Sequence, residues 1–270
     1  MCPTKIVGGH TEDAVWVIDG ATNLDKIAVS PCGDDGEWIA TALNDILLAV
    51  DWCQYSSIAD ILQMATIQMR EQYLEWMDGA AQKPSTYPSA AIALVRRLDN
   101  SRLEYLVLGD CSITVISKTE QYFTNRDIMD LDAVAIAELS SLMQSGLPLA
   151  EARAGISDTL IKNRNLMNTP GGYWIISLDP AAPKHAAQGI IEDAVGSKIM
   201  LASDGFSRLW DLFGVAVQGQ DAYDKIAEAG LQQTLNLLRQ TEQDDSNMVR
   251  HPRFKVSDDA SVAICQFAAR

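Results

Sequence analysis

The chain has 270 residues, of which 47% are hydrophobic and 21% charged, a composition typical of a globular protein with a sizeable core. Its formal net charge of −15 argues against nonspecific binding to nucleic acid, whose backbone carries the same sign. Because no apolar run approaches ~20 residues and the N-terminus lacks a signal-peptide layout, we expect a cytoplasmic protein that contacts neither membrane nor nucleic acid.

The first half of the chain opens with a short apolar run over residues 14–18 that ends at Asp19-Gly20, the pattern of a buried strand entering a turn. Apolar residues at helical spacing then predict two helices, over residues 37–52 and 57–77. Three strands are predicted next, over residues 90–97, 103–108 and 112–117.

The second half of the chain is predicted to contain further helices and strands. A helical stretch covers residues 127–165, with a break at 145–148, and further helices are predicted over 206–214 and 221–242. Strands are predicted over residues 172–177, 198–202 and 261–267. Runs of strands broken by helix pairs do not favour a doubly wound parallel sheet. They predict an α+β protein in which two antiparallel sheets stack, flanked by helices, and no linker or repeat divides residues 1–270, so we expect one domain.

Acidic residues stand where predicted strands end. Asp19, Asp110 and Asp204 each follow an apolar strand, and Asp258-Asp259 comes just before the last strand. Strand ends can meet at one edge of a sheet, and carboxylates gathered there repel one another unless a cation compensates. Hard divalent cations prefer such oxygen ligands. Any single Asp-Gly is more often a plain tight turn, so the hypothesis depends on all four positions together.

Other metal and redox chemistries find little support. The five cysteines show no CxxC spacing, and the three histidines form neither an HExxH motif nor a cluster. A zinc centre and a disulfide framework are therefore disfavoured.

Four blocks of the sequence, taken in order, carry a family pattern. They are Val17-Ile-Asp19-Gly20, Leu108-Gly-Asp110-Cys111, Leu201-Ala-Ser-Asp204-Gly205 and Ser257-Asp258-Asp259-Ala-Ser261. Together they resemble the PP2C (PPM) family of metal-dependent serine/threonine protein phosphatases, in a bacterial-like variant. The pair Glu12-Asp13 also resembles the acidic pair on that family's first strand. The resemblance spans nearly the whole chain and implies a four-layer α/β/β/α sandwich.

The resemblance also implies a role for each matched residue. Asp19 would bridge two Mg²⁺ or Mn²⁺ ions, the carbonyl of Gly20 would bind one of them, and Asp204 and Asp258 would be further ligands. Asp13 would contact metal-bound water, and Asp110 would bind a third, weaker ion. A water or hydroxide bridging the two metals would then hydrolyse the phosphoserine or phosphothreonine of a phosphoprotein substrate.

Two positions depart from the pattern. The phosphate-gripping arginine of the family is Gly8 here, and the histidine after the first Asp-Gly is Ala21. His10, or a cation of the basic segment before Asp258 such as Arg253, could take the phosphate role, although a solvated basic loop is the commoner interpretation of that segment. The segment 163–174 could also line a substrate groove through Arg164 or Asn168, although a plain loop is the commoner interpretation.

Two other functions are alternatives to a PP2C-like phosphatase. A haloacid-dehalogenase-type phosphatase needs a nucleophilic aspartate at the position of Val17, so this interpretation fails. The other rival is a catalytically inactive PP2C-like module that binds a partner or phosphate. The changes at Gly8 and Ala21 favour it, whereas the retained Asp19, Asp204 and Asp258 oppose it.

Overall fold

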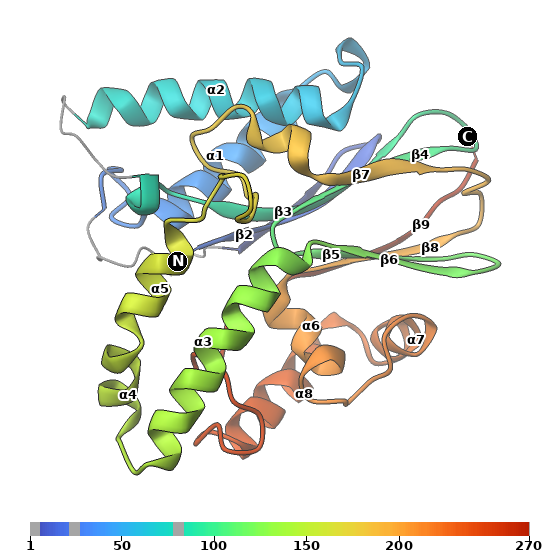
Figure 1. The fold of residues 1–270 in the computed structure, drawn as a ribbon. Helices are drawn as coiled ribbons and strands as arrows, with labels where there is room; N and C mark the ends of the chain where they lie inside the picture. The colour runs from blue at the N-terminus through green and yellow to red at the C-terminus, as the bar shows by residue number, and fades with distance from the viewer. Residues whose placement is uncertain (1–5, 22–27, 78–83, 270) are drawn as a thin grey trace.

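The computed structural model describes residues 6–21, 28–77 and 84–269 and shows two antiparallel sheets packed face to face between layers of helices (Figure 1). Sheet A has the strand order β1-β2-β3-β4-β7, and sheet B has the order β6-β5-β8-β9. The strands of sheet A are β1 Ile6–His10, β2 Ala14–Gly20, β3 Ala90–Arg97, β4 Leu103–Leu108 and β7 Ala187–Ile191. Those of sheet B are β5 Ser112–Ile116, β6 Glu120–Thr124, β8 Lys198–Ala202 and β9 Val262–Gln266. This α+β architecture confirms the predicted fold class.

Helices cover the outer faces of both sheets. On sheet A these are α1 Asp35–Ala49 and α2 Ile58–Trp76, and on sheet B they are α6 Asp204–Asp211, α7 Gln220–Ala229 and α8 Leu231–Asp244. A third group, α3 Arg126–Gln144, α4 Leu149–Gly155 and α5 Ser157–Arg164, projects from one end of the sandwich (Figure 1). Among the described residues, no helix is both long and apolar enough to cross a membrane.

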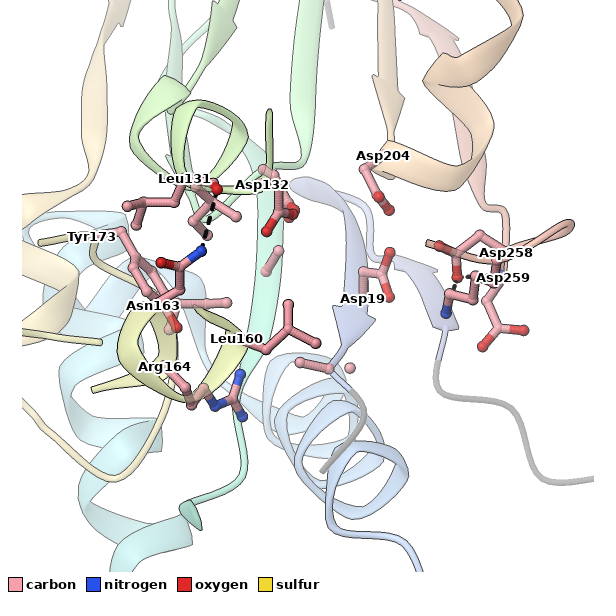
Figure 2. A pocket seen from close by; sticks show the side chains of 17 residues that line it. Asp19, Leu131, Asp132, Leu160, Asn163, Arg164, Tyr173, Asp204, Asp258 and Asp259 are labelled. Atoms are coloured by element: carbon pink, nitrogen blue, oxygen red, sulfur yellow. Dashed lines mark hydrogen bonds and ion pairs between the residues drawn. The ribbon is translucent and has the colours of Figure 1, made fainter. Parts of the chain in front are cut away.

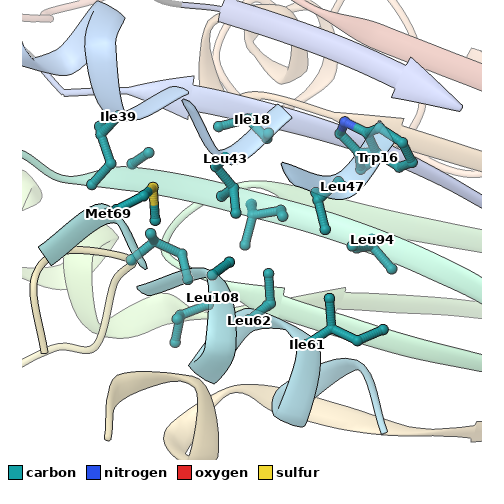
Figure 3. Close-up of a cluster of buried hydrophobic side chains, with 14 of the residues drawn as sticks. Trp16, Ile18, Ile39, Leu43, Leu47, Ile61, Leu62, Met69, Leu94 and Leu108 are labelled. Atoms are coloured by element: carbon teal, nitrogen blue, oxygen red, sulfur yellow. The ribbon is translucent and has the colours of Figure 1, made fainter. Parts of the chain in front are cut away.

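Side-chain alternation along the strands divides the core into layers. On β2, Trp16 and Ile18 pack against Leu43 and Leu47 of α1 in the cluster drawn in Figure 3. Val17, between them, belongs instead to the cluster that fills the space between the two sheets. Asp19 lies two residues after Val17 on the same strand, so its side chain is on the inter-sheet side at the strand's end.

The third layer of the core lies between sheet B and its helices. Met200 and Ala202 of β8 pack against Phe206, Leu209 and Trp210 of α6. These contacts fix the start of α6, which begins at Asp204, directly after the buried strand.

The structure differs from the predictions at several elements. Residues 172–177 form a loop with two isolated bridges, Tyr173 to Met167 and Ile176 to Ala90, and no regular strand. The apolar side chains of this loop are buried between other elements, which explains the strand-like pattern of the sequence. The predicted helix over 221–242 is two helices, because Gly230 takes a φ of 82°. Strands β1, β6 and β7 were not predicted, and all three are edge strands, which need fewer buried side chains.

Candidate active site

A pocket of about 230 Å³ opens at the end of the sandwich next to α3 and α5, and the predicted strand-end aspartates line it (Figure 2). Asp19 ends β2, Asp110 follows β4, Asp204 begins α6 after β8, and Asp258 precedes β9. Four strand ends far apart in the sequence therefore meet at one place.

Two glycines permit this approach of chain segments. A Cβ on Gly205 would lie 1.9 Å from the carbonyl oxygen of Asp259, so the first turn of α6 can pack against the Asp258-Asp259 segment only without a side chain there. Gly109 has a φ of 87° and would place a Cβ 2.6 Å from that of Ala91, which explains the glycine before Asp110.

The carboxylates interact strongly in the absence of a cation. Burial, with repulsion from Asp204 and Asp110, raises the pKa of Asp19 well above its ordinary value. Burial and the charges of Asp204 and Asp132 likewise raise the pKa of Asp110. The carboxyl groups of Asp19 and Asp204 point toward each other (Figure 2), and burial together with the charge of Asp258 raises the pKa of Asp204 as well.

A fifth carboxylate comes from the helical projection. Asp132, on the second turn of α3, lines the same pocket, and burial together with the charge of Asp204 raises its pKa to about 7. Asp132 was not among the site residues predicted from the sequence. The helical periodicity of α3 is visible in the sequence, but no local sequence pattern indicates that the face of α3 that carries Asp132 lies over the strand ends.

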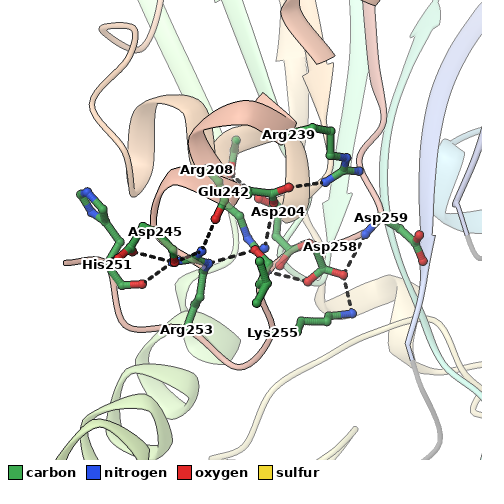
Figure 4. A network of polar contacts seen from close by, with 12 residues as sticks. Asp204, Arg208, Arg239, Glu242, Asp245, His251, Arg253, Lys255, Asp258 and Asp259 are labelled. Carbon is green, nitrogen blue, oxygen red and sulfur yellow. Dashed lines mark hydrogen bonds and ion pairs between the residues drawn. The ribbon is translucent and has the colours of Figure 1, made fainter. Parts of the chain in front are cut away.

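Asp258 is held by two cations. Its Oδ2 accepts a 2.7 Å bond from Arg208, and its Oδ1 is paired with Lys255 (Figure 4). Arg208 reaches on to Glu242 of α8, so Asp258 is anchored to the helices under sheet B.

The pocket fits divalent cations in its donor chemistry. Asp19, Asp204 and Asp258 offer the oxygen ligands that Mg²⁺ and Mn²⁺ prefer, and the raised pKa values record a negative charge that a cation would relieve. Within the described part of the chain, no group of three or more His, Cys, Asp or Glu side chains already stands in an arrangement that could hold an ion.

Three predicted site residues lie elsewhere. In the β1–β2 hairpin Ile6 is opposite Asp19 and His10 is opposite Val15, so Asp13 lies in the turn at the far end of β2. Asp19 comes six positions after Asp13 along the extended chain, a distance of roughly 20 Å at ~3.3 Å per residue. His10 and Asp13 line a different cavity, between the other ends of the sheets.

Arg253 is also outside the pocket. Its side chain is 3% exposed, and its guanidinium donates to Asp245 and to the backbone carbonyls of His251, Glu242 and Val256. This arrangement pins the loop after α8. Lys255, two residues further along the same basic segment, lines the pocket instead.

The segment 163–174 contributes to the pocket in part. Asn163, Arg164 and Tyr173 line it, and Arg164 donates from Nε and Nη2 to the carbonyls of Ser85 and Tyr87. Asn168 has a positive φ of 52° and accepts a bond from the amide of Ile175, which is a turn-forming role.

The fold is similar to that of solved bacterial phosphatases. The serine/threonine phosphatase PstP/Ppp of Mycobacterium tuberculosis matches with a TM-score of 0.56 at 13% identity, over 99% of this chain and 94% of that chain. MsPP, a PPM Ser-Thr phosphatase from Mycobacterium smegmatis in complex with cacodylate, matches with a TM-score of 0.51 at 14% identity, over 99% and 94%. PppA, a regulatory component of T6SS in Pseudomonas aeruginosa, matches with a TM-score of 0.51 at 11% identity, over 97% and 89%.

These likenesses extend over nearly the whole chain and confirm the structural resemblance to bacterial PPM/PP2C phosphatases. No protein-family model and no curated protein sequence matches the chain. At identities of 11–14% the likenesses establish the fold, and the chemistry has to be argued from the site.

Proposed function

We propose that the protein is a metal-dependent phosphatase that hydrolyses phosphoserine or phosphothreonine monoesters of a protein substrate, with residues 1–270 acting as one domain. One observation carries the proposal. Aspartates from four separate strand ends meet in one pocket, with raised pKa values at Asp19, Asp110 and Asp204, in a fold shared with bacterial serine/threonine phosphatases.

Asp19, Asp204 and Asp258, with the carbonyl oxygen of Gly20, would hold two Mg²⁺ or Mn²⁺ ions, and Asp110 would serve a third. When bound, such ions supply positive charge for the phosphate and lower the pKa of water toward ~7. Ion binding would offset the repulsion that raises the pKa values of Asp19 and Asp204. The covering helices supply walls, since Ile128 and Leu131 of α3 and Leu160 of α5 line the same pocket and limit access of bulk water.

The site contains no histidine to protonate the leaving group. Ala21 occupies the position after Asp19-Gly20, and His10 lies at the other end of β2. Asp132 is the described pocket residue with a pKa near neutrality, about 7, so it is suited to exchange a proton with a leaving oxygen or with water.

The test is hydrolysis of p-nitrophenyl phosphate with Mn²⁺, Mg²⁺ or EDTA. We expect release that depends on metal and falls at least a hundredfold in Asp19→Asn. Asp45→Asn makes the same change on the exposed face of α1 and should retain full activity. A folded wild-type protein that is inactive with every metal, or an Asp19→Asn variant as fast as wild type, would refute the proposal.

A second candidate function has one observation in its favour. Asp258 is already neutralised by Arg208 and Lys255, an arrangement that would suit a module that binds a partner or phosphate without turnover. Calorimetric titration with Mn²⁺ separates the two candidates, because only the phosphatase requires tight binding of the ion.

A further inference from the structure

We propose that Lys255 binds the phosphate of the substrate, and that its pairing with Asp258 is a resting state which divalent cations release. The proposal rests on the proposed phosphatase function and identifies the cation that takes the place of the arginine missing at Gly8. In this proposal the ammonium group of Lys255 and the metal ions compete for the carboxylate of Asp258.

Lys255 is placed to do this. Its Nζ is paired with Oδ1 of Asp258, and the residue lines the same pocket as Asp19 and Asp204 (Figure 4). Its side chain is 42% exposed, so the four-carbon stem has room to turn within the pocket. An ammonium group at the end of such a stem binds phosphate as a point charge.

Among the described residues, the other cations near the site already have partners. Arg208 is 11% exposed and bridges Asp258 to the fully buried Glu242. Arg253 is enclosed by Asp245 and backbone carbonyls. Arg164 lines the pocket, but it donates to the carbonyls of Ser85 and Tyr87 on the side of the pocket away from Asp258 (Figure 2).

The charges in the pocket favour the exchange. A partly exposed ion pair contributes only about 0–1 kcal/mol, so the bond between Lys255 and Asp258 is easily broken. Divalent cations held by the aspartates would repel the ammonium group and take the oxygen of Asp258. The phosphate of a substrate, arriving with about two negative charges, would then attract Lys255 in its new position.

This exchange predicts two effects of opposite sign. In Lys255→Gln, Mg²⁺ should bind severalfold more tightly, because a competitor for Asp258 is gone. Inorganic phosphate should bind the Mg²⁺-loaded variant about tenfold more weakly, the loss expected for one charge-assisted hydrogen bond. Lys255→Arg should keep phosphate affinity within about threefold of wild type. A residue with a merely structural role would not shift the two affinities in opposite directions.

The experiment is calorimetric titration of Mg²⁺ into the metal-free protein, followed by titration of inorganic phosphate into the loaded protein. Lys225→Gln is the matched control, since Lys225 is also paired with an aspartate three to four residues away but lies on α7. Arg164→Gln tests the competing residue. Unchanged phosphate affinity in Lys255→Gln, or a larger loss in Arg164→Gln, would overturn the proposal.

Hydrolysis assays separate this proposal from the function on which it rests. In an active protein, Lys255→Gln should raise KM for p-nitrophenyl phosphate about tenfold with a smaller change in kcat. If the wild type binds phosphate through Lys255 but hydrolyses nothing, the phosphatase function fails and the role of Lys255 stands. If the wild type is active and Lys255→Gln leaves both KM and phosphate affinity unchanged, only the role of Lys255 fails.

Discussion

Nη2 of Arg208 lies 2.7 Å from Oδ2 of Asp258, and Nη1 of the same side chain lies 3.3 Å from Oε1 of Glu242. The proposed metal ligand Asp258 is thereby connected to α8, which packs against α6. Glu242 is fully buried and has a second partner in Arg239. The site aspartate on the last loop is therefore positioned by the helix layer under sheet B.

We predict that Arg208→Met will lower the free energy of unfolding by about 2–4 kcal/mol, because it removes one of two cations that neutralise the buried Glu242. Arg239→Met removes the other cation, whose side chain is 36% exposed, and should cost about 1 kcal/mol. Urea unfolding of the two variants measures the difference. Equal losses would mean that Arg208 is not the main partner of Glu242.

Asp19→Asn should leave the metal-free protein at least as stable as wild type. The substitution removes a charge that burial and the neighbouring aspartates disfavour, which is why the pKa of Asp19 is raised. Thermal unfolding in EDTA, with Asp45→Asn as the surface control, gives the comparison. A clear drop in Tm for Asp19→Asn alone would contradict the repulsion described at this site.

The stability of the metal-free protein should fall as the pH rises from about 4 to about 7. The folded-state pKa of Asp132 is about 7, against ~3.9 for an unfolded aspartate, so between these values the folded protein binds more protons. The associated stability is complete below pH ~4 and is lost as the pH passes ~7. Asp19 and Asp110, whose pKa values are also raised, act in the same direction.

Asp132→Asn should flatten part of this slope and stabilise the metal-free protein by about 1–2 kcal/mol above pH 7. Urea titrations in EDTA at pH 4.5, 6 and 7.5 measure the slope, and Asp45→Asn should leave it unchanged. The interpretation of Asp132 would be wrong if its variant kept the full wild-type dependence on pH.

A buried ion pair far from the site should matter for stability. Arg96 of β3 and Glu104 of β4 form an ion pair in which Nη2 lies 2.5 Å from Oε2, and their side chains are 4% and 10% exposed. Arg96 also donates to the carbonyls of Trp52, Tyr55 and Ser56, while Glu104 accepts from the first amide of α2. Together these bonds secure the segment that leads into α2.

We expect Arg96→Met to lose about 3–5 kcal/mol, since it leaves the charge of Glu104 buried without its partner. The double variant Arg96→Met with Glu104→Gln should recover part of the loss. Lys225→Met, in an exposed pair with Asp221, should lose under ~1 kcal/mol in the same unfolding assay. A loss as small at Arg96 would show that its backbone contacts and ion pair contribute little.

Much of the fold could be predicted from local patterns. The apolar runs around Val17 and Leu201 indicated buried strands, and the spacing of Ile39, Leu43 and Leu47 indicated a helix that packs on a sheet. The edge strands β1, β6 and β7 were missed, because an edge strand is held by backbone pairing and carries a weaker apolar signal.

The candidate site could be predicted only where its residues end strands. Asp19, Asp110, Asp204 and Asp258 were found because each stands at a strand boundary, which the sequence marks by a change from apolar to polar residues. Asp13 was assigned to the site by the family resemblance, yet the register of the β1–β2 hairpin carries it to the opposite end of the sandwich.

The sequence by itself determined the elements and the acidic strand ends, because helical periodicity, strand patterning and turns depend on residues close together in the chain. The tertiary structure alone decided that Asp132 of α3 and Lys255 of the last loop join these aspartates, while Arg253, two residues from Lys255, is turned away. Which side chains reach the pocket depends on how the strands pair and where the helices pack. This packing brings together side chains that are more than a hundred residues apart in the sequence.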